Sequence, residues 1–390
     1  MSLEALIAKA RLGFQQRYGE PCSHVAWAPG RINLIGEHTD YTGGLCMPAA
    51  IDRHVVCAIR PISAPVAHFY SVSYTEELDL PLPVRDAPTE GWGAYAAGAV
   101  AVFQEALVQA GRSIGRGVEV LILGDVPLGA GLSSSAAIEC ALLGALKAAF
   151  SLPLSDLTLA QLAQQVEHRF LGLKSGLLDP YASQLSRAGN VMVIDFRTLQ
   201  HQYVPADMGP WCWLVIDTGV RRALAASAYG ERVRSCQEGL AALRMAGAAH
   251  HLRDATVDMV ESIGGGAPWV PRLRHVIREN ARVEAAARAL TVGDHLGLGR
   301  LLVESHESLR QDYSVSCPEL DRLVDVARGQ PGWAGGRMIG GGFGGCTLHL
   351  VRAEAAEALA AHISDAFEDR FKRPAPSWRF KLVGGAGASR

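Results

Sequence analysis

The pattern of apolar and polar residues predicts alternating strands and helices in the first half of the chain. Residues 118–123 are mostly β-prone and apolar, which is typical of a buried strand, and the Ala-rich residues 136–150 predict a helix. A loop rich in Gly and Ser separates these segments. Thr158 and Gln161 have the spacing of a capping box, which predicts the start of a second helix that carries Glu167.

The second half of the chain predicts a mixture of helices and strands. The apolar residues 213–216 predict its opening strand. The other predicted elements are helices near 227–246, 272–290 and 295–312, a helix capped by Ser316 and Glu319, strands at 337–339, 347–351 and 378–382, and a helix at 353–371. This order is typical of an α+β sandwich.

Length and composition indicate two lobes. The chain has 390 residues, of which 49% are hydrophobic, and a single core rarely grows beyond roughly 250–300 residues. We predict an N-terminal lobe at residues 1–205 and a C-terminal lobe at 206–390. A formal charge of −2 without blocks of like charge argues against nucleic acid and anionic membranes as partners.

Several features favour a soluble protein of the cytoplasm. No apolar run approaches the roughly 18–20 residues that span a bilayer, and residues 1–17 predict an amphipathic helix rather than a signal peptide. Eight cysteines are scattered without a Cys-x-x-Cys pair, so we expect reduced and mostly buried thiols. Work on small molecules fits these properties best.

Residues 28–41 combine a guanidinium, two carboxylates, an imidazole and a phenol with small or apolar neighbours. These groups belong to Arg31, Glu37, His38, Asp40 and Tyr41. A core strand does not need such side chains, whereas a compact polyhydroxylated ligand needs several fixed donors and acceptors that converge on its hydroxyls. The segment therefore predicts a binding loop for a small polar substrate such as a hexose.

Residues 127–137 predict a site for nucleotide phosphates. The chain lacks the Gly-x-x-x-x-Gly-Lys-Ser/Thr motif, which excludes a Walker-type loop with its lysine. Gly129 and Gly131 let the backbone approach an anion, and Ser133, Ser134 and Ser135 stand where the predicted helix begins. The free N–H groups and positive dipole end of that helix take the place of the missing cation.

A second glycine-rich loop at residues 340–345 satisfies Gly-x-Gly-x-x-Gly, with Asp365 about 20 residues further on. The dinucleotide fingerprint must open a helix, but residues 346–351 have a strand pattern. A dinucleotide site is therefore excluded.

Residues 28–41, 127–137 and 340–346 together resemble the signatures of galactokinases, which belong to the GHMP kinases. Similarity continues through 304–306 and 312–321 and spans nearly the whole chain. The resemblance implies an α+β, two-lobed GHMP kinase fold. It has an N-terminal α/β lobe with the Gly/Ser phosphate loop at a helix N-terminus, a ferredoxin-like C-terminal lobe, and the active site between the lobes.

The resemblance also implies a reaction, in which ATP phosphorylates the anomeric hydroxyl of α-D-galactose. By its spacing after Gly176 and before Tyr229, Asp179 matches the family's catalytic aspartate, as a base or an orienting carboxylate, with Arg31 as its partner. The implied sugar-binding residues are Glu37, His38, Asp40, Gly176 and Tyr229. The implied ATP-binding residues are Gly129, Gly131, Ser133, Ser134, Ser135 and Trp92, and the implied Mg²⁺ ligands are Ser135 and Glu167.

The chain departs from the family pattern at a few positions. Pro180 replaces a glutamine and predicts an extended Asp179, Thr42 replaces an asparagine, and the residues after Trp92 are unusually small. Two alternatives stay open: a related anomeric kinase for N-acetylgalactosamine, arabinose or another hexose, and a non-catalytic sensor of galactose and ATP. The intact residues 135–137 argue against the sensor. We expect a sugar and ATP as partners and no nucleic acid or membrane; a monomer is compatible with the sequence, which does not fix the oligomeric state.

Overall fold

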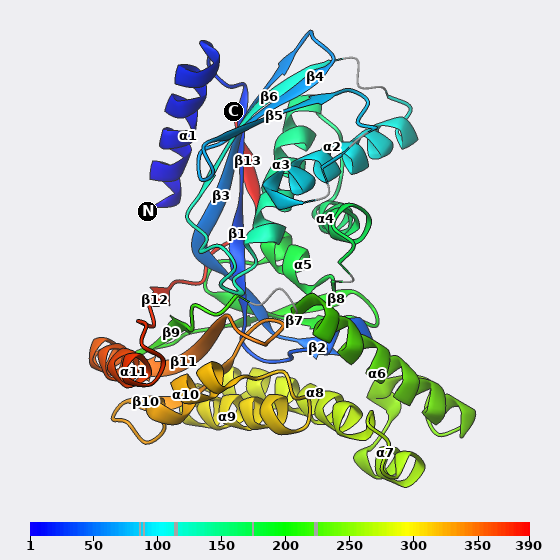
Figure 1. Ribbon diagram of the computed structural model, residues 1–390, viewed down its shortest axis with the longest axis vertical. Coiled ribbons are helices and arrows are strands. Elements are labelled where there is room, and N and C mark those ends of the chain that lie inside the picture. The colour runs from blue at the N-terminus through cyan, green and yellow to red at the C-terminus, as the bar shows by residue number, and fades with distance from the viewer. Residues whose placement is uncertain (86, 89, 113–115, 174, 222–224) are drawn as a thin grey trace.

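The chain forms two lobes, which Figure 1 shows one above the other in a computed structural model. The structure describes residues 1–85, 87–88, 90–112, 116–173, 175–221 and 225–390. The helices are α1 (Leu3–Tyr18), α2 (Gly91–Gln109), α3 (Ser134–Phe150), α4 (Asp156–Phe170), α5 (Leu178–Leu185), α6 (Ala225–Met245), α7 (Val257–Gly264), α8 (Val270–Thr291), α9 (His295–Gln311), α10 (Pro318–Ala327) and α11 (Ala356–Phe371), with short 3-10 turns η1 (Asp40–Thr42) and η2 (Leu252–Asp254). The strands are β1 (His24–Asn33), β2 (Leu45–Cys46), β3 (Pro48–Ile62), β4 (Val66–Ser71), β5 (Glu76–Pro81), β6 (Gly117–Gly124), β7 (Asn190–Asp195), β8 (Gln200–Pro205), β9 (Trp211–Asp217), β10 (Trp333–Met338), β11 (Cys346–Arg352), β12 (Ser377–Phe380) and β13 (Gly387–Ser389).

The upper lobe is built on a sheet with the order β13-β1-β3-β6-β4-β5. β4 and β6 run parallel, and the other neighbours run antiparallel. Helix α1 packs its apolar residues Leu6, Ala10 and Phe14 on one face, while α2, α3 and α4 lie on the other (Figure 1). The predicted strand at 118–123 is β6 and the predicted helix at 136–150 is α3, so both predictions are confirmed.

The lower lobe contains an antiparallel sheet with the order β10-β11-β9-β12. In chain order its strands follow the pattern 2-3-1-4, which is the ferredoxin-like arrangement. Helices α10 and α11 pack against this sheet and share a core with Leu214 and Ile216 of β9. The ferredoxin-like C-terminal lobe predicted from the resemblance is confirmed.

The end of the chain returns to the upper lobe, where β13 pairs with β1. The predicted division assigned β13 to the C-terminal lobe at residues 206–390. The division into residues 1–205 and 206–390 stays a prediction. Of the eight cysteines, six are buried, as expected. Within the described ranges, no helix combines the length and apolar character needed to cross a membrane.

Three local predictions were wrong. Helix α4 begins at Asp156, because the Ser155 hydroxyl accepts the Thr158 N–H at 3.1 Å, so the cap lies three residues before the predicted one. Helix α10 follows Cys317, and the Ser316 hydroxyl instead bonds to the Asp321 carboxylate at 2.5 Å. Asp179 is not extended but helical.

The position of Pro180 in α5 explains why a proline after Asp179 does not prevent a helix. Asp179 and Pro180 are the second and third residues of α5. Backbone N–H groups in the first turn of a helix have no partner within the helix, so a proline there removes no helical hydrogen bond. Pro180 is therefore compatible with a helix that begins at Leu178.

Arg337 of β10 joins the two lobes through buried contacts. Its side chain is fully buried, and Nη1 donates to the carbonyl oxygens of Asn33 at 3.2 Å and Leu34 at 2.9 Å. Nη2 lies 3.2 Å from Oε1 of Glu37. A strand of the lower lobe thereby holds the segment that follows β1 of the upper lobe.

We predict that Arg337→Met lowers the free energy of unfolding by about 3–5 kcal/mol, because it leaves the buried Glu37 carboxylate without its ion-pair partner. Urea denaturation of the wild type and the variant measures this change. Arg300→Met is the control: this exposed guanidinium lies 3.9 Å from Asp294, so its loss is expected to cost at most about 1 kcal/mol. Equal losses in the two variants would contradict a special role for Arg337.

Candidate active site

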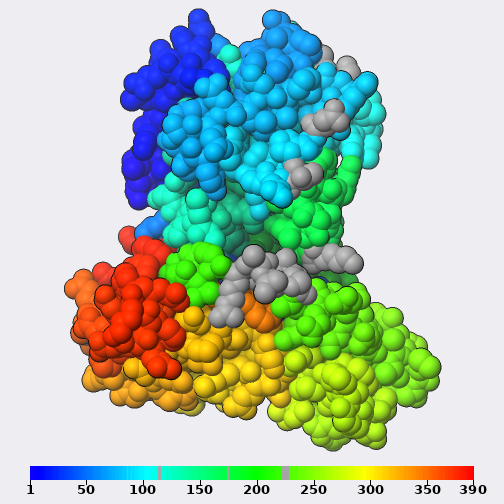
Figure 2. Space-filling model, in the orientation of Figure 1, coloured from blue at the N-terminus to red at the C-terminus, as the bar shows by residue number. Residues whose placement is uncertain are grey.

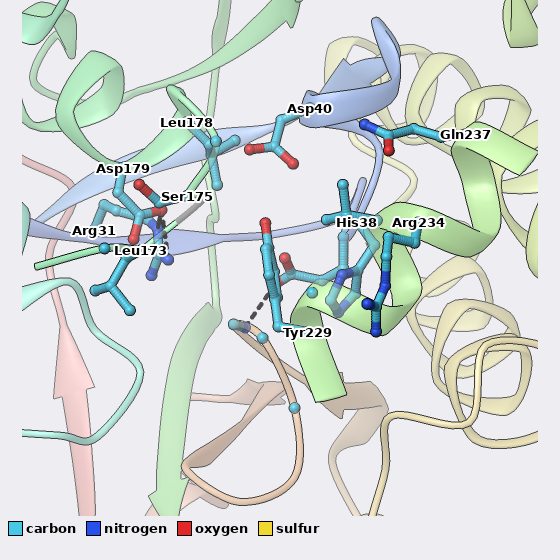
Figure 3. A pocket seen from close by; sticks show the side chains of 18 residues that line it. Arg31, His38, Asp40, Leu173, Ser175, Leu178, Asp179, Tyr229, Arg234 and Gln237 are labelled. Carbon is cyan, nitrogen blue, oxygen red and sulfur yellow. Dashed lines mark hydrogen bonds and ion pairs between the residues drawn. The ribbon is translucent and has the colours of Figure 1, made fainter. Parts of the chain in front are cut away.

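A cavity of about 690 Å³ lies between the two lobes. Figure 2 shows the protein narrowing where the blue-to-cyan upper part meets the yellow-to-red lower part. The cavity walls come from the loop after β1, the segment before α5, helix α6 and the glycine loop after β10. Figure 3 shows Arg31 and Asp179 at one side of the cavity, Arg234 and Gln237 at the other, and Tyr229 between them.

The loop after β1 is folded so that its polar side chains face this cavity. Gly36 has φ +95°, and a Cβ there would lie 2.6 Å from the carbonyl oxygen of Leu45, so the turn requires glycine. The Thr39 hydroxyl lies within hydrogen-bonding distance of the carbonyls of Gly36 and Leu45 and closes the loop. Glu37 and His38 are buried in this arrangement.

Glu37 connects the loop after β1 to the glycine loop of the lower lobe. Its Oε1 atom accepts the backbone N–H of Gly340 at 2.8 Å and lies 3.2 Å from Arg337. The carboxylate is 5% exposed and lines the cavity. Charge-assisted hydrogen bonds of this kind are short and strong, and they fix the position of the acceptor.

Asp179 lies between Arg31 and the phosphate loop. Its Oδ1 atom accepts from Arg31 Nε at 2.7 Å and lies 2.6 Å from Nη2, while Oδ2 accepts from the Ser133 hydroxyl. Arg31 Nη1 also donates to the carbonyl oxygen of Gly131 at 2.8 Å. The four residues form one hydrogen-bonded unit at the edge of the cavity.

Asp40 lies near this unit, and the pKa of its carboxyl group is shifted from the ordinary value. Burial, together with the negative charge of Asp179, raises the pKa of Asp40 to about 7. Gly176 packs against Asp40 so closely that a Cβ at this position would overlap the carboxylate. A side chain at residue 176 would therefore require the Asp40 carboxylate to move out of its present position.

His38 is a neutral imidazole in this site. Burial, with a further contribution from His275, lowers the pKa of His38 to about 3. Nδ1 lies 2.9 Å from the Tyr41 hydroxyl, and Nε2 has no hydrogen-bond partner in the described part of the chain. The Tyr229 ring lies 5.4 Å from the imidazole, and burial raises the pKa of Tyr229.

A second cavity of about 410 Å³ lies where the two glycine-rich loops meet. Gly129 and Gly131 line it from the upper lobe, and residues 341–345 line it from the lower lobe. Arg221 also lines this cavity, with Nη1 and Nη2 lying 2.9 and 2.5 Å from the Asp217 carboxylate oxygens. Gly131 lines this second cavity, and its carbonyl oxygen accepts a hydrogen bond from Arg31, which lines the large cavity. The two cavities are therefore neighbours.

Ser133, Ser134 and Ser135 lie at the start of α3, as expected. Ser133 is the N-cap residue in a left-handed conformation with φ 59°, and its hydroxyl is used by Asp179 rather than by the helix. The first N–H groups of α3 are therefore left without a side-chain cap. A helix N-terminus in this state is suited to an anion.

Ser135 and Glu167 offer the kind of hard oxygen atoms that Mg²⁺ prefers, and their role as its ligands stays a prediction. Glu167 is 6% exposed, and burial raises the pKa of its carboxyl group, with the negative charge of Asp179 adding to this rise. Within the described ranges, no three His, Cys, Asp or Glu side chains converge to hold a metal ion. Mg²⁺ is usually held by one or two carboxylates together with substrate phosphates, which is the set that this site can offer.

Trp92 lies apart from the other predicted residues. Its ring is 8% exposed and stacks on Tyr74 with 6.5 Å between the ring centres, and Nε1 donates to Glu76 at 2.6 Å. Trp92 lines neither of the two cavities described above. Its contact with a nucleotide stays a prediction.

Several residues at the site were not predicted from the sequence. Arg337 and Arg221 approach it from distant parts of the chain, and no local pattern marks them. Val233 and Gln237 of α6 line the large cavity together with Tyr229, which was predicted. Their spacing of four places them on one helix face, so this signal was available in the sequence.

Comparison with known proteins identifies the family. The galactokinase galactose-binding signature matches residues 13–61, the GHMP kinase N-terminal domain matches 94–187, and the GHMP kinase C-terminal model matches 284–369. The chain is 42% identical over 353 residues to a galactokinase of Chloroflexus aggregans, covering 89% of each chain, and 37% identical over 370 residues to galactokinase of Homo sapiens, covering 92% of each.

A solved structure agrees with this assignment. The crystal structure of Lactococcus lactis galactokinase complexed with galactose matches with a TM-score of 0.91 at 30% identity, covering 98% of this chain and 99% of that one. A mevalonate kinase structure matches at 18% identity with a TM-score of 0.68, which reflects the common fold. The chain therefore belongs to the galactokinase family of GHMP kinases.

Proposed function

We propose that the protein transfers the γ-phosphoryl group of ATP to the anomeric hydroxyl of α-D-galactose, forming α-D-galactose 1-phosphate and ADP. The observation that carries this proposal is the position of Asp179. It is held by Arg31 and Ser133 beside the phosphate loop, and it also lines the cavity that contains Glu37, His38 and Asp40.

The sugar is bound by side chains of the large cavity. The Glu37 and Asp40 carboxylates accept hydrogen bonds from sugar hydroxyls, the absence of a side chain at Gly176 leaves space, and Tyr229 contributes an aromatic wall. An epimer that misplaces one hydroxyl leaves a buried polar group unpaired, at a cost of about 1–3 kcal/mol. This cost favours galactose over its epimers.

The ATP phosphates are bound mainly by backbone groups. We place them across the second cavity, against Gly129 and Gly131 and the first N–H groups of α3. Ser135 and Glu167 would hold Mg²⁺, which neutralises charge on the phosphates. Arg31 and Arg221 supply permanent positive charge at the borders of this region.

Phosphoryl transfer then requires one bond to form and one to break. The anomeric oxygen attacks the γ-phosphorus while the bond to the β,γ-bridging oxygen breaks, and ADP leaves with that electron pair. Asp179 orients the attacking hydroxyl and accepts its proton. The Arg31 guanidinium stabilises negative charge on the transferring group and holds Asp179 in place.

A second candidate is an anomeric kinase for a galactose derivative with a larger 2-substituent, such as N-acetylgalactosamine. The cavity favours considering it, because Arg234 and Gln237 of α6 add polar groups on the side opposite Asp179 (Figure 3). The reaction and the role of Asp179 are the same in both cases.

The acceptor can be identified by ADP release with Mg-ATP and a panel of galactose, glucose, N-acetylgalactosamine, arabinose and mevalonate. We expect galactose to give a kcat/KM at least about tenfold above every other acceptor, because each misplaced hydroxyl costs about 1–3 kcal/mol. A preference for N-acetylgalactosamine would support the second candidate. Galactose binding without turnover on any acceptor would instead indicate a sensor.

We predict that Asp179→Asn lowers kcat by at least about a thousandfold while galactose affinity changes less than about threefold. The amide keeps the shape of the side chain but cannot accept the proton or pair with Arg31 as a carboxylate. Steady-state kinetics and calorimetric titration with galactose measure the two effects. The surface variant Asp156→Asn is the control, and a turnover similar to it would remove Asp179 from the mechanism.

We predict that Asp40→Asn stabilises the protein at high pH but weakens galactose binding. The folded-state pKa of Asp40 is about 7, above its ordinary value near 4, so the folded wild type loses stability as the pH rises from about 4 to about 7. The asparagine variant lacks this loss. Its advantage in unfolding free energy should therefore grow by about 1–2 kcal/mol between pH 5.5 and pH 8.

Urea denaturation at the two pH values tests this prediction, with Asp156→Asn as the surface control. The galactose KM of Asp40→Asn is expected to rise at least about tenfold at pH 8, because one of the two carboxylate acceptors is replaced by an NH₂ donor. If the difference in unfolding free energy between the variant and the wild type is the same at both pH values, the charge of Asp40 does not destabilise the folded protein.

A further inference from the structure

The glycine loop at residues 340–345 contains one residue that is not glycine. Every glycine of this loop except Gly341 has a positive φ angle, and Phe343 shares this backbone region with φ 61°. A left-handed conformation is unfavourable for a bulky side chain, because its Cβ crowds a neighbouring carbonyl oxygen. A glycine would avoid this cost, so we expect the Phe343 ring to make contacts that offset it.

The Phe343 ring connects the glycine loop to helix α6. It lies 5.9 Å from Cζ of Arg232, within the range of a cation–π contact. It also packs against the apolar core that α6 and α8 share in the lower lobe. Phe343 lines the second cavity as well. One side chain therefore contacts both α6 and the region where we place the ATP phosphates.

Arg232 is held in one orientation by its other contacts. Nε donates to the carbonyl oxygen of Tyr313 at 2.8 Å, Nη2 donates to that of Ser314 at 2.9 Å, and Nη1 lies 3.0 Å from Oε1 of Glu231. The residue is only 8% exposed. A planar guanidinium with all three nitrogens engaged has little freedom to turn, so the face that it presents to Phe343 is fixed.

Residues 313–315 also bind the backbone of the glycine loop. The Phe343 N–H donates to the carbonyl oxygen of Val315 at 2.7 Å. A Cβ at Gly342 would lie 2.3 Å from the same oxygen, so the two segments pack without space between them. Arg232, residues 313–315 and Phe343 therefore form a closed set of contacts, which we call the α6 joint.

Helix α6 also forms a wall of the large cavity. Tyr229 lines this cavity and precedes Arg232 by three residues, which is about one helical turn. A Cβ at Gly341 would lie 3.6 Å from the Tyr229 ring, so the glycine loop passes beside this ring. The Gly340 N–H donates to Glu37, which lines the same cavity. The glycine loop is thus attached to two walls of the large cavity.

We propose that Arg232 and Phe343 are positioning residues that join the glycine loop to helix α6, so that a sugar in the large cavity strengthens nucleotide binding in the second cavity. The inference rests on the proposed function, because it relates the two substrate sites of that reaction.

The coupling follows from the order of the contacts. A sugar packed against Tyr229 restrains the helical turn that carries Arg232, and Arg232 then holds Phe343 and the glycine loop in place. A nucleotide that arrives later finds this loop already ordered, so less of its binding free energy is lost in ordering it. Coupling of this kind is reciprocal, so the nucleotide strengthens sugar binding by the same factor.

Hydrogen–deuterium exchange tests the α6 joint in the protein without ligands. We expect the peptide that covers residues 340–345 to be protected in the wild type and to exchange at least about tenfold faster in Arg232→Met. Methionine keeps an apolar side chain at this position but has no donors for the carbonyl oxygens. Unchanged exchange in Arg232→Met would overturn the proposal, whether or not galactose is the acceptor, because the measurement uses neither sugar nor nucleotide.

Calorimetric titration with the magnesium complex of a non-hydrolysable ATP analogue measures the coupling. We expect saturating galactose to tighten this binding at least about fivefold in the wild type and less than about twofold in Arg232→Met and Phe343→Gly. The same ratio in wild type and variants, or a wild-type ratio below about twofold, would overturn the proposal. If the wild type bound no galactose, the proposed function would fail, and the exchange experiment would still uphold or overturn the α6 joint.

Substitutions of Phe343 separate positioning from stability. Glycine adopts φ 61° without strain, so we expect Phe343→Gly to lose the coupling while its urea midpoint changes little. Phe343→Ala loses the ring but keeps the unfavourable backbone, so it should lose the coupling and also unfold at lower urea. Phe343→Tyr keeps an aromatic ring and should retain the wild-type coupling. Wild-type coupling in Phe343→Gly would show that the ring has no positioning role.

Lys372→Gly is the matched control. Lys372 also has a positive φ, 57°, but it follows α11 and lines neither cavity. Its replacement removes the same kind of backbone strain, so stability should rise while the coupling and the exchange of residues 340–345 keep their wild-type values. A loss of coupling as large as in Phe343→Gly would show that general backbone effects, and not the α6 joint, are the cause.

Discussion

The site depends on one buried ion pair, between Glu37 of the upper lobe and Arg337 of the lower lobe. A carboxylate that is only 5% exposed is costly unless a positive charge and hydrogen bonds compensate for the lost water. Arg337 provides that charge and at the same time binds the carbonyl oxygens of Asn33 and Leu34. The conformation of the loop after β1 therefore depends on contacts between the two lobes.

The carboxylates of the cavity show how the charges are distributed. Glu37 and Asp179 each have an arginine partner, whereas the pKa of Asp40 is raised by burial and by the nearby Asp179. Asp40 thus lowers the stability of the folded state at neutral pH. Such a cost is expected where a polar group serves a ligand rather than the fold, because the missing hydrogen-bond partners arrive with the substrate.

The sequence predicted well those parts of the structure that depend on residues close together in the chain. Periodicity located β6 and α3, and the crowding of polar groups in residues 28–41 located the loop that lines the cavity. The errors came from competing local interactions, as when Ser155 rather than Thr158 capped α4. The pairs Glu37–Arg337 and Tyr41–Tyr313 join residues about 300 and 270 positions apart, and no single-sequence pattern encodes such contacts.

The second cavity is lined mainly by backbone, whereas the large cavity is lined mainly by side chains. This difference affects which substitutions the site tolerates. Gly342 and Gly344 pack so tightly against the backbone of Val315 and Val220 that a Cβ would lie 2.3 and 2.7 Å from carbonyl oxygens. The phosphate side is thus formed by backbone that tolerates little substitution, whereas the sugar side is formed by side chains on a loop and on α6. In the proposed function, acceptor preference can therefore shift through residues such as Arg234 while the phosphate machinery stays the same.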